Sequence, residues 1–149
     1  MSNFLTDGRL ALIAALQGDA AIDARVRTYL DFGPGLTRRH AVEPSLCPVL
    51  SVAPAEAREY VVANVEREVP QMLRVEVATA EQDVEPCEEL VALVLSRVQA
   101  CNEDCLNLAA DGLIGLRAES VSWASEPHDS AARLIWTAAI TVRLLWRRI

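Results

Sequence analysis

One long amphipathic run, residues 133–147, constrains the fold of this chain more than any other stretch. Seven apolar side chains stand there at every second position: Leu134, Trp136, Ala138, Ile140, Val142, Leu144 and Trp146. The positions between them carry Thr137, Thr141, Arg143 and Arg147 together with Ile135 and Leu145. A period of two is typical of a β-strand, so the run predicts a strand with one fully apolar face. At roughly 3.3 Å per residue it would be about 45 Å long, well beyond the usual strand, and we expect part of it to extend past its own sheet.

Length and composition predict a single soluble domain covering residues 1–149. The chain has 149 residues, of which 52% are hydrophobic and 23% are charged, so it can bury one full core. No stretch approaches the ~18 uninterrupted apolar residues of a membrane span, and residues 1–4 do not open a signal peptide. We therefore expect that the protein is made in the cytoplasm and does not associate with a membrane.

The charge balance bears on nucleic-acid partners. Fourteen basic residues oppose 21 acidic ones, for a net charge of −7. A protein that reads a nucleic-acid sequence normally shows a basic stripe, which makes that role improbable on physical grounds. An acidic protein could instead surround a passage through which DNA moves without binding, because its field repels phosphate.

The cysteines and histidines give no pattern of a catalytic or metal site. Cys47, Cys87, Cys101 and Cys105 form no CxxC pair, and we expect them to be buried small hydrophobic residues rather than disulfides. A shared metal at Cys101 and Cys105 would need further ligands, and the two histidines, His40 and His128, are distant in the sequence. Neither histidine has a nucleophile signature nearby, and no cofactor fingerprint occurs. The sequence predicts a protein that is not an enzyme and holds no metal or cofactor.

Two main helices are predicted. The first carries Leu5, Leu12, Ile13 and Leu16 at helical spacing, is capped by Thr6 and Asp7, and ends at residues 18–19. A separate short helical turn through Ile22 is predicted after it. The second begins at Pro86 and buries a stripe formed by Leu90, Leu93, Val94, Val98 and Cys101. The acids at 81–89 before and within its first turn have two interpretations: a negative rim for a partner or a lumen, or a capped helix start with solvated charges.

Apolar alternation also predicts strands at 26–30, 47–52, 71–77 and 112–123, with a turn at 126–130 before the final strand. The predicted fold class is α+β: a mainly antiparallel sheet of four to five strands, two main helices packed on one face, and a long C-terminal β-hairpin.

Three segments are candidate partner contacts. Residues 31–44 form a long predicted loop, and residues 54–67 an irregular or hairpin arm; a solvated surface excursion is the alternative for the loop. Together with the final strand they supply the candidate contact residues Arg38, Arg39, His40, Tyr60, Val61, Val62, Arg143, Trp146 and Arg147.

The order of these elements resembles the tail-terminator and minor-tail-protein family of long-tailed bacteriophages. The resemblance lies in four elements in order: the proline-containing strand 46–52 after a long loop, the strand 72–77, the helical stretch 88–94, and the closing hairpin from Leu116 to Trp146. It spans nearly the whole chain as an order of elements and contains no diagnostic motif.

The resemblance implies a structural virion protein of the tail and neck, assembled in the host cytoplasm. In the family such a protein forms a homohexameric ring that caps the head-proximal end of the tail tube and joins it to the neck or head connector protein, while DNA passes through the lumen. It implies no catalytic residues and no cofactors. The alternatives are a neck or head-completion protein of the same particle, and a cytoplasmic adaptor that binds a peptide along the edge of its sheet.

Overall fold

The computed structural model describes residues 4–31, 46–55, 68–102, 112–127 and 134–147. Their elements follow in the order α1 (Phe4–Gln17), α2 (Ala20–Arg25), β1 (Thr28–Asp31), β2 (Val49–Pro54), β3 (Glu68–Ala80), α4 (Glu85–Ala100), β4 (Leu113–Pro127) and β5 (Leu134–Arg147). The five strands form one sheet in the order β1-β2-β3-β5-β4. All its neighbouring pairs are antiparallel except β1 and β2, which are parallel. The predicted fold class is confirmed, with this one parallel pair making the sheet mixed.

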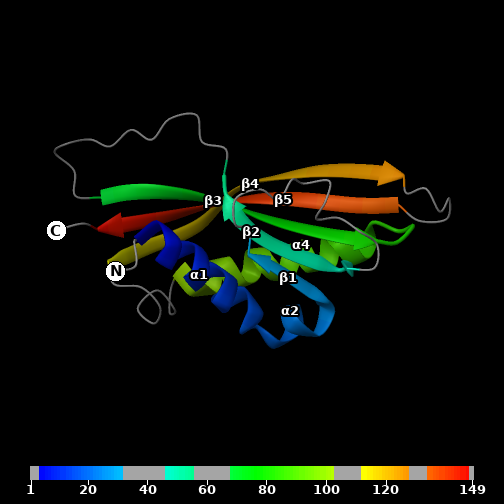
Figure 1. Ribbon diagram of the computed structural model, residues 1–149, viewed down its shortest axis with the longest axis horizontal. Helices are drawn as coiled ribbons and strands as arrows, with labels where there is room; N and C mark the ends of the chain where they lie inside the picture. The colour runs from blue at the N-terminus through cyan, green and yellow to red at the C-terminus, as the bar shows by residue number, and fades with distance from the viewer. Residues whose placement is uncertain (1–3, 32–45, 56–67, 103–111, 128–133, 148–149) are drawn as a thin grey trace.

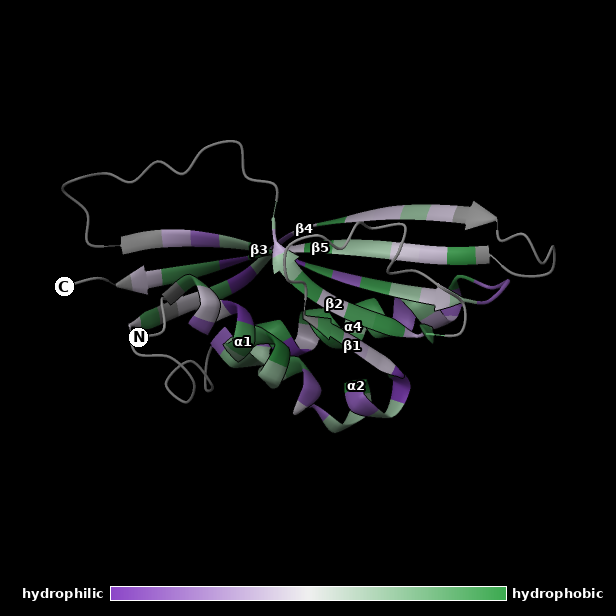
Figure 2. Cartoon of the chain, viewed as in Figure 1, coloured by the Kyte–Doolittle hydropathy of each residue, from purple (hydrophilic) through white to green (hydrophobic). Residues whose placement is uncertain are grey.

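The helices lie on one face of the sheet, which gives the domain two layers (Figure 1). Local signals explain where they start: the Asp19 carboxylate accepts hydrogen bonds from Ala21 N and Ile22 N at the start of α2, and Pro86 stands in the first turn of α4. In Figure 2 the helices alternate hydrophobic and hydrophilic segments, as amphipathic helices do. Their apolar stripes therefore determine which side packs on the sheet.

The core fills the space between the helices and the sheet. Its fully buried side chains include Leu16 of α1, Ile22 of α2, Leu90 and Val94 of α4, and Ile140 of β5. Burying a side chain of this size contributes roughly 1.5–3 kcal/mol, so this one layer supplies most of the driving force for folding. The apolar face predicted for the last strand is the one turned toward this layer.

The long strand β5 does not extend past its sheet, and that expectation was wrong. β3 pairs with it from Glu68 to Ala80, and β4 pairs with it from Leu113 to Pro127, so β5 has a hydrogen-bonded neighbour on each side along its whole length. Its length is matched by two neighbours that are themselves longer than the sequence indicated. Residues 126–127, expected in a turn, belong to β4.

Smaller points concern the start of α1 and the cysteines. α1 begins at Phe4, so Thr6 and Asp7 lie inside its first turn instead of capping it, and Leu5 is 46% exposed rather than part of the buried stripe. Cys47, Cys87 and Cys101 are buried, as predicted. Cys105 lies outside the described residues.

Candidate assembly surface

The side of the sheet that faces away from α1, α2 and α4 is here called the helix-free face. Strand alternation and the register place these side chains on it: Ser51, Ala53, Met72, Arg74, Glu76, Ala78, Arg117, Ser120, Ser122, Thr137, Ala139, Thr141 and Arg143. Many are small or polar, but Val49, Ala78 and Ile135 also lie on this face and are buried there in a second hydrophobic cluster with Cys47. Ser51, Thr137 and Ala139 are buried as well. The accessible part of the face therefore includes the part around Arg74, Arg117 and Arg143.

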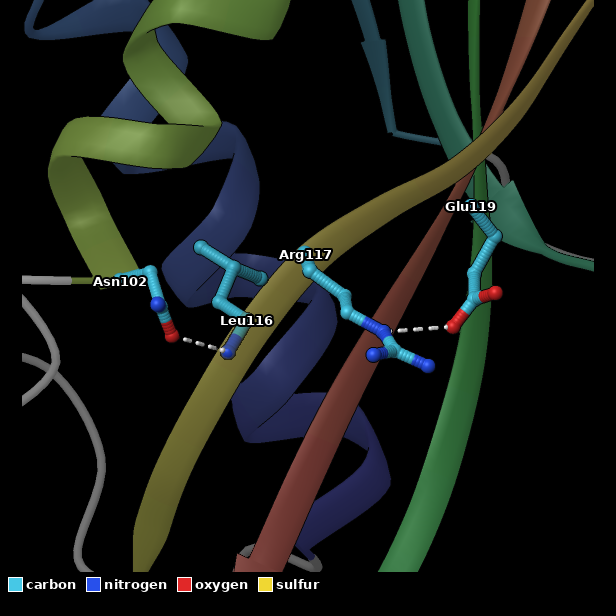
Figure 3. Close-up of polar contacts among 4 residues, drawn as sticks. All are labelled: Asn102, Leu116, Arg117 and Glu119. Atoms are coloured by element: carbon cyan, nitrogen blue, oxygen red, sulfur yellow. Dashed lines mark hydrogen bonds and ion pairs between the residues drawn. The ribbon is translucent and has the colours of Figure 1, made fainter.

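Three arginines lie close together on this face. Arg74 Nε is 3.5 Å from Glu76 Oε2 on β3, and Arg117 Nε donates to Glu119 Oε1 at 2.8 Å on β4 (Figure 3). Arg143 of β5 stands between them, directly opposite Arg117 in the register. Like charges opposite each other on neighbouring strands disfavour the pairing, so this row favours an added negative charge.

Arg143 differs from the other two in having no acid two positions along its strand. On β3 and β4 the arginine is followed by a glutamate at the second position, while β5 has Thr141 and Leu145 on either side of Arg143. Within the described ranges no carboxylate pairs with the Arg143 guanidinium. Its side chain is partly exposed and can be reached from outside the fold.

The outer edge of β4 is the second feature of this surface. Among the strands that the structure describes, β4 pairs only with β5. The Leu116 N–H donates to Asn102 Oδ1 at 3.0 Å, so the end of α4 protects the edge at this point (Figure 3). Register shifts between Leu113 and Gly115 and between Ala118 and Ser120 distort the strand on both sides of this point. A capping side chain and a bulge both commonly protect a strand edge.

Over residues 120–125, beyond the second register shift, the described structure has neither a side chain capping the edge of β4 nor a further register shift. The segment reads Ser-Val-Ser-Trp-Ala-Ser without a charged side chain, and Trp123 is 46% exposed. Alternate backbone N–H and C=O groups here point away from β5. An edge strand of the described sheet is therefore β4, whereas the last strand, β5, lies inside it. The usable signal was that β5 carries apolar residues on both faces, which is typical of a central strand.

Trp146, predicted as a partner contact, is in the core. Its side chain is 1% exposed, and its indole Nε1 donates to Gln71 Oε1 at 2.9 Å. Gln71 Nε2 in turn donates to the Leu5 carbonyl oxygen at 2.8 Å, which joins β5, β3 and α1. Gly8 permits this close approach, because a Cβ at that position would fall against Gln71 and within 2.8 Å of Trp146 Cζ2. Trp146 fixes α1 on the sheet and offers no surface in a single chain.

The remaining predicted contact residues are not placed by the structure. Arg38, Arg39, His40, Tyr60, Val61 and Val62 lie outside the described residues. The backbone of Arg147 pairs with Glu68 at the end of β5, and its side chain is likewise outside the description. Of the predicted set, Arg143 alone has a described side chain on the helix-free face.

The acids between β3 and α4 lie at the opposite end of the sheet from Arg143. Glu81, Asp83 and Glu85 are exposed, and this turn is drawn as hydrophilic in Figure 2. Asp83 Oδ1 accepts a hydrogen bond from Glu85 N at 3.2 Å, which gives that carboxylate a local role at the start of α4. The predicted helix start with solvated charges is thus present, and Glu81 is not used by it.

The pKa values of three titratable groups, Cys47, Cys87 and Tyr29, are raised, which favours their neutral forms. Burial raises the pKa of the Cys47 thiol to about 11, and burial likewise raises the pKa of Cys87. Burial and a 3.0 Å hydrogen bond to Asp23 raise the pKa of the Tyr29 hydroxyl. In the described part of the chain no group of three metal-binding side chains occurs, and no helix there is long and apolar enough to cross a membrane.

Comparison with known proteins gives matches at the level of structure. No protein-family model matches this sequence, and no curated protein sequence matches it. Among solved structures, a chain from the virion of a native gene transfer agent (GTA) particle is similar, with a TM-score of 0.59 and 14% sequence identity. The match covers 92% of this chain and 93% of that chain. At this identity it shows a shared fold over nearly the full length of both.

Proposed function

We propose that this chain is a structural protein of a phage-like virion. The observation that carries the proposal is the fold shared with a virion chain of a gene transfer agent particle, over more than nine-tenths of both chains. The helix-free face with its arginines and the uncharged edge of β4 support an assembly role, because both are surfaces that a second protein can cover. The buried, protonated thiols offer no activated nucleophile.

Within such a particle, we propose the role of tail terminator. The chain would form a homohexameric ring that caps the head-proximal end of the tail tube, contacts the tube protein, and joins the neck or head connector protein. The net charge of −7 supports a ring around a DNA passage, because a negative lumen lets DNA slide without binding. Arg38, Arg39, His40, Tyr60, Val61, Val62, Arg143 and Arg147 are the proposed contact residues, and the particle is assembled in the cytoplasm of its host.

Deletion of the gene in particle-producing cells tests the role, with electron microscopy as the readout. A tail terminator is required to stop tube growth, so the deletion should leave tubes of variable, excessive length and heads without tails. A neck or head-completion protein would instead leave tubes of uniform length beside unjoined heads. A cytoplasmic adaptor would leave the particles unchanged, and that result would refute the proposal.

The purified protein provides the second test. A ring-former should give a single large species or a concentration-dependent series by sedimentation, with a central opening in negative-stain images. A chain that stays monomeric at every concentration, and does not associate when tube ends are added, would contradict the terminator role.

A further inference from the structure

We draw no further inference here: the strongest candidate, the uncharged outer edge of β4 over residues 120–125 with the exposed Trp123, carries no proposal because nothing in the structure shows what covers it.

Discussion

Replacing Gln71 by leucine should destabilise the fold by about 2 kcal/mol, and the structure indicates how that figure arises. Gln71 is 4% exposed and connects the Trp146 indole to the Leu5 carbonyl. Loss of its acceptor at a buried N–H costs roughly 1–3 kcal/mol, and loss of the bond to Leu5 costs about 1 kcal/mol. The Leu5 oxygen still accepts the helical bond of α1, and a buried leucine returns about 1 kcal/mol of apolar burial.

Urea unfolding followed by far-UV circular dichroism measures the change, with an unaltered slope showing that the unfolding transition is comparable. Gln17→Leu, an exposed position at the end of α1, is the control and should remain within about 0.5 kcal/mol. Trp146→Phe removes the donor itself, so it should cost at least about 1 kcal/mol less in the Gln71→Leu background than alone. Equal costs in both backgrounds, or a Gln71→Leu variant as stable as the original, would refute the hydrogen-bonded connection.

Three further changes have defined outcomes. Gly8→Ala should lower stability by about 1–3 kcal/mol in the same assay, although alanine favours helices, because its Cβ would press on Trp146; unchanged stability would mean that α1 lies farther from the sheet. Asn102→Ala should speed amide hydrogen exchange at Leu116 at least tenfold while central-strand amides keep their protection, and a uniform rate would contradict the edge contact. Burial raises the pKa of the Cys47 thiol from its ordinary 9.0 to about 11 in the folded protein, so the unfolded thiol ionises first and stability should fall as pH rises from about 9 to 11. Cys47→Ala should reduce that slope in unfolding measured across this pH range.

Local patterns were sufficient to predict the elements and their inner faces. The alternation that placed Ile140, Val142 and Leu144 on one side of β5, and the spacing that placed Leu90 and Val94 on one side of α4, both depend on residues close together in the sequence. These signals are periodic and strong, and the structure confirms them. Element ends were less well predicted, since β3 and β4 continue through residues whose own preference for strands is weak.

The position of β5 in the sheet was beyond local patterns. Pairing of β3 with β5 joins residues far apart in the sequence, such as Val75 and Ile140, and the free energy that selects this register comes from the assembled core. Length alone suggested a projecting strand. The better indicator was Ile135, an apolar residue on the face of β5 opposite the core helices. It is 5% exposed, so β5 is covered on that face as well.

The candidate surface was predicted only in part for the same reason. Arg143 and Trp146 were both selected as residues of the final strand, which was expected to project from its sheet. Arg143 lies on the helix-free face. Trp146 lies in the core, and only the fold reveals that Gln71 accepts its indole N–H. Trp123 was missed because an edge strand is defined by the absence of a neighbour, which no sequence window contains.

The central place of β5 has a consequence for how the protein is made. The ribosome releases β3 and β4 before β5, yet each of them pairs with β5 along its length. Until the last strand emerges and inserts, β3 has one unpaired side and β4 has no partner among the described strands, so both expose free backbone groups. Nascent chains interrupted before residue 134 should therefore be targets for chaperones and proteases, and the emergence of β5 becomes the step that commits the sheet to form.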